Sequence, residues 1–194
     1  MTEVSQYKDD LVVQIREAYG RITYTYTSHL KLMNRLSNKN NIIKILQITF
    51  SAISTGGFVG ALVINETAST VIGGVFSTLL LAINLFFKDF NLHDEMKQHR
   101  AAADELWLVR EQYISLLTDA PLIDIENIVT RRNELQSKTY DIYKQYPKTD
   151  AKSYAAAQIA LKKKEEQFFR QEEIDNMLPS HLRIGNNLST IDKN

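Results

Sequence analysis

The stretch ILQITFSAISTGGFVGALVI, residues 45–64, contains no charged side chain, and STVIGGVFSTLLLAINLFF, residues 69–87, contains none either. A helix rises about 1.5 Å per residue, so each stretch is long enough to cross the roughly 30 Å hydrocarbon core of a bilayer. Leu, Ile, Val and Phe dominate both, and each favours insertion by about 0.3 to 0.6 kcal/mol. Helices that are apolar on all sides would otherwise need a large soluble protein around them, which a chain of 194 residues does not supply. The pattern predicts two transmembrane helices.

The connection between the two stretches, Asn65-Glu66-Thr67-Ala68, is long enough only for a tight turn. We therefore expect an antiparallel hairpin over residues 45–87. Basic residues flank its open end, whereas the turn carries a single acid, and the positive-inside rule then places both termini in the cytoplasm. The flanking cations are Lys31, Arg35, Lys39 and Lys44 before the first span and Lys88, Lys97 and Arg100 after the second.

Small residues within the spans predict a surface on which helices approach each other closely. In lipid, helix association depends on close backbone packing rather than on a hydrophobic driving force. Packing inside the hairpin is the simplest role for such a surface, and packing against other copies of the chain is the alternative. The candidate helix-packing residues are Gly56, Gly60, Gly73 and Gly74.

Polar side chains also recur at helical spacing within the spans. Such a stripe either lines a water-filled path between subunits or holds helices together inside a bundle, and both interpretations stay open. The spans contain no charge that would indicate a proton relay or an ion-coupled transporter. The candidate pore-lining residues are Gln47, Ser51, Ser54 and Thr55 in the first span and Thr70, Ser77, Thr78 and Asn84 in the second.

Apolar side chains recur mostly every three or four residues from Val4 to Leu36, and this pattern predicts one amphipathic helix on the cytoplasmic side within residues 1–44. Weak helix formers follow and favour a bend or a surface boundary just before the membrane. These are Asn38, Asn40 and Asn41.

Residues 88–184 predict a second cytoplasmic helical domain. Its first helix carries apolar residues in alternating steps of four and three, a coiled-coil-like seam that His99 and Arg110 interrupt. We expect this seam to pack against the N-terminal helix or against neighbouring subunits, with Trp107 as a core or interface anchor. The candidate interface residues are Leu92, Met96, Leu106, Trp107, Tyr113 and Leu117.

Three shorter helices are expected further along the same domain. Asp124 can cap the first, which stops at Pro147. The next is expected over about residues 153–169 and the last over residues 172–178, before a tail, residues 185–194, that is predicted to be disordered. Because no strand pattern appears, the fold class is an all-α membrane protein.

The sequence offers no recognisable catalytic, metal or cofactor site, so we expect a protein that is not an enzyme. There is no cysteine, and the formal net charge of zero gives no reason to expect direct binding of nucleic acid. His93 and His99 come nearest to a ligand cluster, but six residues of helix place them on different faces.

Short motifs in a fixed order around the two spans resemble the SLATT family of bacterial two-helix membrane proteins, in the subfamily often linked with reverse transcriptases. The resemblance runs from residue 16 to residue 117 and continues more loosely to Pro179. It rests on REAYGR at residues 16–21, SAISTGG at 51–57, LFFKDF at 85–90, HR at 99–100, ELW at 105–107, REQYISLLTD at 110–119 and EEID at 172–175.

The resemblance implies an effector of bacterial anti-phage systems, located in the inner membrane and triggered by a cytoplasmic sensor. A homo-oligomeric pore that disrupts the membrane is one hypothesis. A non-conducting anchor or signalling adaptor is the other, and a receptor for a soluble ligand is weaker than both. The partners implied are the lipid bilayer, other copies of the chain, and a nucleotide second messenger or a reverse-transcriptase-type defence protein.

Overall fold

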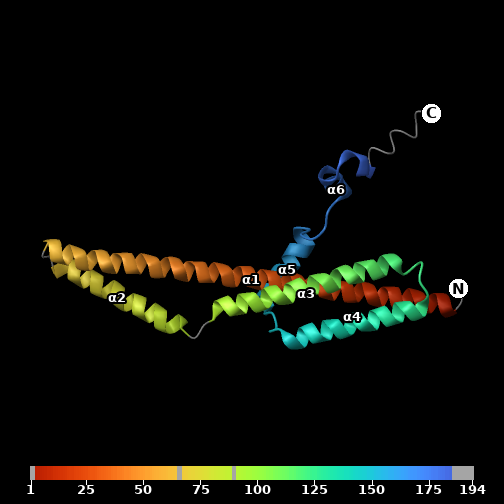
Figure 1. Ribbon diagram of the computed structural model, residues 1–194, viewed down its shortest axis with the longest axis horizontal. Helices are drawn as coiled ribbons and strands as arrows, with labels where there is room; N and C mark the ends of the chain where they lie inside the picture. Colours follow the sequence, from red (N-terminus) through yellow and green to blue (C-terminus); the bar gives the residue numbers. More distant parts are fainter. Residues whose placement is uncertain (1–2, 65–66, 89–90, 185–194) are drawn as a thin grey trace.

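The computed structural model describes residues 3–64, 67–88 and 91–184, and its regular elements are all helical (Figure 1). This confirms the all-α prediction for the described part of the chain. The predicted tail, residues 185–194, lies outside it. In chain order the elements are α1 (Glu3–Ile64), α2 (Thr67–Phe87), α3 (Leu92–Asp119), α4 (Ile125–Gln145), α5 (Ala151–Lys163), α6 (Gln171–Met177) and the 3-10 helix η1 (Ser180–Leu182).

Helix α1 runs without interruption through 62 residues, about 90 Å at the usual helical rise. The sequence predicted a bend or a boundary near Lys39, but the helix continues through it. Asparagine costs only a few tenths of a kcal/mol in a helix interior. Leu36 and Ile43, on either side of this segment, are buried in one apolar cluster and hold the helix in place. The extramembrane segment and the first span therefore form one rod.

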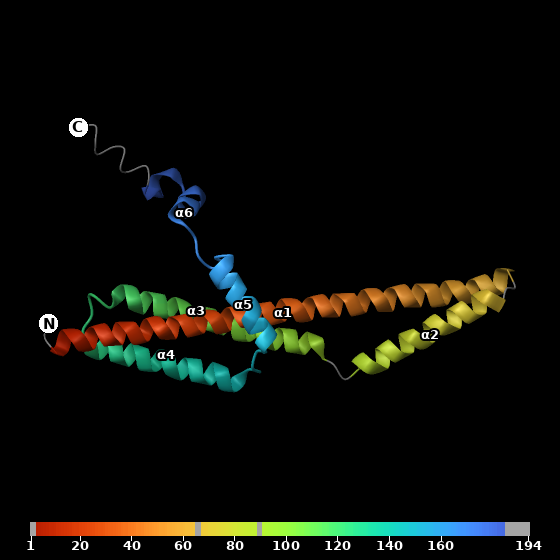
Figure 2. The same cartoon turned by 180° about the vertical axis from the view of Figure 1, so that it is seen from behind.

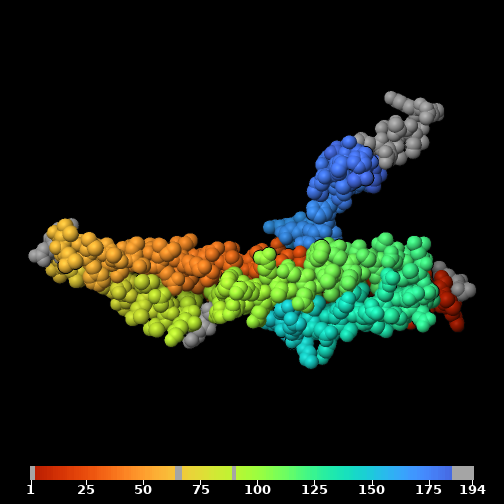
Figure 3. Space-filling model, in the orientation of Figure 1, coloured from red at the N-terminus to blue at the C-terminus, as the bar shows by residue number. Residues whose placement is uncertain are grey.

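The hairpin, residues 45–87, consists of the second part of α1 and the antiparallel helix α2, and it extends beyond the rest of the chain (Figures 1 and 2). In the space-filling view no other segment covers this side of it (Figure 3). Only 6% of each apolar window is buried. Helices of a soluble core would be buried almost completely, so the exposed apolar surface agrees with two membrane spans.

The body consists of residues 3–44 of α1 together with α3, α4 and α5. Helix α3 runs back along α1, and α4 packs against both (Figures 1 and 2). All three helices bury side chains at steps of seven residues, the repeat of a coiled coil. The buried positions in this repeat are Ile15, Ile22, His29, Leu36 and Ile43 in α1, Leu92, His99, Leu106 and Tyr113 in α3, and Ile128, Leu135 and Ile142 in α4.

Among the predicted interface residues, Trp107 lies apart from the others. Leu92, Leu106 and Tyr113 are buried, and Met96 and Leu117 are partly buried against the same clusters. Trp107 stays 48% exposed, because it follows Leu106 on the outer side of α3. It is not a core anchor of this chain, and its role in contact with a partner stays a prediction.

Side-chain caps fix the starts of the helices in the body. The Asp124 carboxylate accepts from the Asn127 amide at 2.8 Å at the start of α4, as the sequence predicted. Helix α4 ends at Gln145, just before Pro147.

Helix α5 ends six residues earlier than the sequence predicted. Its last turn carries Lys162 and Lys163, a favourable place for cations beside the negative end of the helix dipole. The backbone then enters the left-handed region at Glu165 (φ 51°) and Gln167 (φ 79°), which a continuing α-helix does not allow. The predicted short helix near the C-terminus is present as α6.

Candidate functional site

An open groove on the outer face of the hairpin is the principal candidate site, and we call it the polar groove. It has a volume of about 850 Å³. Gln47, Ser51 and Thr55 lie on one side of α1 because they are spaced four residues apart. Asn84 completes the polar lining from α2. Ile48, Ala52, Gly56, Val59 and Leu80 form the apolar remainder.

The two amides of the polar groove are joined across the hairpin. The Gln47 side-chain nitrogen donates to the Asn84 oxygen at 2.8 Å. One bond uses only part of what two amide groups can donate and accept. In hydrocarbon each unsatisfied polar group costs several kcal/mol. The two amides are therefore more stable beside water, lipid headgroups or another protein surface than beside hydrocarbon.

The other four candidate pore-lining residues lie outside the polar groove. Ser54 is buried between the two helices, where its hydroxyl donates to the Gly73 carbonyl at 3.2 Å. Thr78 donates to the Gly74 carbonyl of its own helix at 2.9 Å. Thr70 and Ser77 are exposed on α2. The predicted stripe thus divides between the groove, the hairpin contact and the outside of α2.

Two glycines make a close backbone contact between α1 and α2. A Cβ atom added to Gly57 would lie 2.8 Å from the Gly73 Cα and 2.9 Å from the Ser69 carbonyl oxygen. Of the predicted helix-packing residues, Gly73 and Gly60 lie at this contact. Gly56 and Gly74 have open space where a Cβ would stand, and their packing against another copy stays a prediction.

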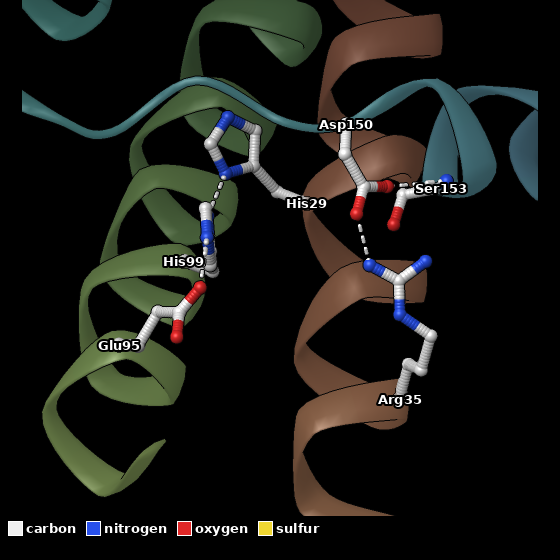
Figure 4. A network of polar contacts seen from close by, with 6 residues as sticks. All are labelled: His29, Arg35, Glu95, His99, Asp150 and Ser153. Carbon is white, nitrogen blue, oxygen red and sulfur yellow. Dashed lines mark hydrogen bonds and ion pairs between the residues drawn. The ribbon is translucent and has the colours of Figure 1, made fainter. Parts of the chain in front are cut away.

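A pair of buried histidines interrupts the apolar seam of the body, 16 residues before the first span in α1. The Nδ1 atoms of His29 in α1 and His99 in α3 lie 2.9 Å apart (Figure 4). One seven-residue step away from the membrane lie Ile22 and Leu106, which belong to one apolar cluster. One step towards the membrane lie Leu36 and Leu92, which belong to a second cluster. The histidines therefore form one polar layer between two apolar ones.

Burial decides the charge of this layer. Burial, together with the neighbouring His99, lowers the pKa of His29 from 6.5 to about 4, and burial is the larger cause. Burial also lowers the pKa of His99, although the Glu95 and Asp150 carboxylates oppose that effect. Near neutral pH both rings are uncharged, so one Nδ1–H donates to the other ring.

Ion pairs attach α5 and the loop after it to α1. The Arg35 guanidinium donates to the Asp150 carboxylate, which also caps α5 by accepting from the Ser153 amide at 2.8 Å (Figure 4). These bonds lower the pKa of Asp150 to about 2, with Arg35 as the main cause. Farther along, Lys31 lies 2.6 Å from Glu166.

The sequence predicted no metal site, and His93 and His99 do not meet. His93 is exposed, whereas His99 points into the seam. Within residues 3–64, 67–88 and 91–184, no three His, Asp or Glu side chains gather in a way that could hold a metal ion.

A hairpin with an exposed apolar surface, joined through one unbroken helix to a coiled-coil body, defines a two-span α-helical membrane protein. The profile of the SMODS and SLOG-associating 2TM effector domain family 4 matches residues 11–173. The chain belongs to this SLATT family, as the sequence motifs indicated. Searches of curated proteins and of solved structures found no significant match. The link with reverse transcriptases stays a prediction.

Proposed function

We propose that this effector acts in bacterial anti-phage defence as a homo-oligomeric pore, with several hairpins turning their polar grooves towards a common axis. A sensor in the cytoplasm is its trigger. No catalytic step is part of the proposal. Membership of the family supports the role of a membrane effector in a conflict system. The polar groove supports the pore.

The polar groove is the observation that carries the proposal. Two antiparallel helices are too few to enclose an aqueous path, so the groove acquires its second wall only from other copies. Assembly would satisfy the remaining donors and acceptors of Gln47 and Asn84 with water or with neighbouring amides. A groove facing hydrocarbon would satisfy them less well.

The unbroken α1 supplies the mechanical connection. A tilt or rotation of the body is carried directly into residues 45–64, because no hinge separates them. The proposed orientation has both termini in the cytoplasm, where a sensor can reach the body. The cations near the open end of the hairpin favour that orientation under the positive-inside rule.

The pore is tested by making the polar groove apolar. The double substitution Gln47→Leu and Asn84→Leu removes both amides and leaves the glycine contact intact. Induced wild-type protein, together with its trigger, is expected to depolarise the cell membrane and admit a normally excluded dye. The double variant is expected to insert equally well and do neither.

Thr78→Val is the matched control for this experiment. The Thr78 hydroxyl bonds within its own helix and lies outside the polar groove, so this variant is expected to keep full activity. Undiminished depolarisation by the double amide variant would refute the pore as proposed.

A membrane anchor that recruits a partner is the second candidate. It is favoured by the exposed apolar side chains of Trp107 and Leu108 on α3, which a partner surface could cover. The resemblance points to a reverse-transcriptase-type protein or a nucleotide messenger as that partner. Replacing residues 45–87 by an unrelated two-helix hairpin separates the two functions. Retained defence supports the anchor, and lost defence supports the pore.

A further inference from the structure

A second groove lies where the hairpin meets the body, and we call it the junction groove. It has a volume of about 430 Å³ and is bounded by α1 and the final turns of α2. Its walls are almost entirely apolar. The apolar lining residues are Ile42, Ile43, Leu46, Ile83 and Phe87, and Arg35, Asn38 and Lys39 line the end that points towards the body.

Two cations stand together at that end of the junction groove. Arg35 and Lys39 are one helical turn apart on the same side of α1, separated by about 6 Å along the axis. The Lys39 ammonium lies 5.7 Å from the centre of the Phe87 ring. The Arg35 guanidinium bonds to Asp150, but it has five N–H donors and can serve a second acceptor.

The junction groove also lies at the depth of lipid headgroups. The first span begins at Ile45, six residues after Lys39, a helical rise of about 9 Å. The headgroup layer on each side of the hydrocarbon core is about 5 to 8 Å thick. Leu46 and Ile83 therefore lie beside acyl chains, and Lys39 lies just above the phosphates. Arg35 is four residues earlier, about 15 Å from the start of the span, and its long side chain must reach towards the membrane to meet a phosphate.

We propose that the junction groove binds an anionic phospholipid, with an acyl chain against Leu46 and Ile83 and the headgroup phosphate held by Lys39 and Arg35. Basic pockets between transmembrane helices bind anionic headgroups, and charge-assisted bonds from Arg and Lys to phosphate are the strong kind. The groove combines both parts of such a ligand, an apolar channel and a cationic end. The proposal does not depend on the pore.

Native mass spectrometry of the purified full chain in detergent tests the proposal, with phosphatidylglycerol and phosphatidylcholine of the same acyl composition as probes. The wild type is expected to favour phosphatidylglycerol by about tenfold, and Lys39→Gln to lose about fivefold of that preference. Lys44→Gln is the control, because it removes an exposed cation five residues nearer the span that does not line the groove.

Arg35 is tested by a second matched pair. Arg35→Gln is expected to weaken binding of phosphatidylglycerol by a similar factor. Asp150→Asn breaks the same ion pair but keeps the cation, and is expected to leave lipid binding unchanged or tighter. Equal loss in both variants would show that the ion pair, rather than the cation, supports binding, and would overturn this part of the proposal.

Two further measurements distinguish binding of a lipid from binding of a free anion. Glycerol phosphate in about tenfold excess is expected not to displace the bound lipid, whereas Ile83→Trp, which fills the groove, is expected to weaken both lipids. Equal binding of the two lipids by the wild type, equal loss in Lys39→Gln and Lys44→Gln, or displacement by glycerol phosphate would each contradict an anionic-lipid site.

Discussion

The hairpin and the body use opposite packing rules along one continuous helix. In the body, large apolar side chains are buried every seventh residue, and the histidine pair is the polar exception in this repeat. In the hairpin, large apolar side chains such as Leu62 and Val63 point outwards, and Gly57, Gly73 and Ser54 make the contact. Water favours burial of apolar area, whereas lipid favours close backbone packing. The change along α1 marks where one solvent replaces the other.

The same substitution placed in the two regions gives the largest contrast. Leu106 is completely buried, and Leu62 is 87% exposed. Leu106→Ala is expected to lower the free energy of unfolding by about 3 kcal/mol, through lost burial and the cavity left behind. Leu62→Ala is expected to change it by less than about 0.5 kcal/mol. Thermal unfolding in detergent measures both, and equal effects would contradict lipid exposure of Leu62.

Two adjacent glycines of the hairpin provide the next contrast. Gly57→Ala is expected to destabilise the hairpin by about 2 kcal/mol, because the new methyl would lie 2.8 Å from backbone atoms of Gly73. Gly56 has open space, so Gly56→Ala is expected to be neutral or to stabilise by up to about 1 kcal/mol through helix propensity. Unfolding curves of the two variants test this prediction. Equal stability of the two variants, or a larger loss in Gly56→Ala, would contradict it.

The histidine layer makes the stability of the body depend on pH. The pKa of His29 in the folded chain, about 4, lies below its ordinary value of 6.5, so the unfolded chain binds more protons between these values. Stability is therefore fully present above pH 6.5 and decreases as the pH falls towards 4. A shift of one pKa unit corresponds to about 1.4 kcal/mol. We expect a loss of about 2 kcal/mol in the free energy of unfolding over this range, because the two rings can move apart when they become charged and so recover part of the cost.

Substituting the histidines checks the source of that pH dependence. The double variant His29→Leu and His99→Leu continues the apolar seam and is expected to remove most of the slope in melting temperature between pH 7 and pH 5. His93→Gln, at an exposed position, is expected to keep it. An unchanged slope in the double variant would place the titrating group elsewhere.

The smallest effect is expected at the ion pair between Arg35 of α1 and Asp150, the N-cap residue of α5. Asp150→Asn keeps a side chain that can cap α5 but removes the charge that faces Arg35. Exposed ion pairs contribute about 1 kcal/mol or less, and salt weakens them. Melting temperatures at low and high salt should differ for the wild type and converge for the variant. A loss as large as that of Leu106→Ala would mean that α5 belongs to the core.

Local composition was sufficient to predict the spans, the helical class and the cap at Asp124. Each depends on a few neighbouring residues. The early end of α5 was missed because residues 164–169 have no proline or glycine to mark it; the change is in the backbone at Glu165 and Gln167. Packing in the body likewise overrode the expected break near Lys39.

The candidate sites were predicted only in part because they depend on register between helices. Spacing alone placed Gln47, Ser51 and Thr55 on one face, but could not tell that Ser54 meets α2. The histidine pair was missed because His99 was interpreted as an interruption of one seam. The sequence did contain a signal, because His29 lies seven residues from both Ile22 and Leu36 and so belongs to the same buried repeat. The helix that carries its partner begins far along the chain, so spacing alone could not pair the two histidines.

Water access to the two faces of the hairpin tests the central claim most directly. The chain has no cysteine, so single substitutions report on one position at a time. In triggered cells, Ser51→Cys in the polar groove is expected to react with a membrane-impermeant thiol reagent and to reduce the conductance. Leu81→Cys, 58% exposed on α2 and outside the groove, is expected to stay unreactive in lipid. An unreactive cysteine at position 51, or equal reaction at both positions, would contradict a water-filled path along the polar groove.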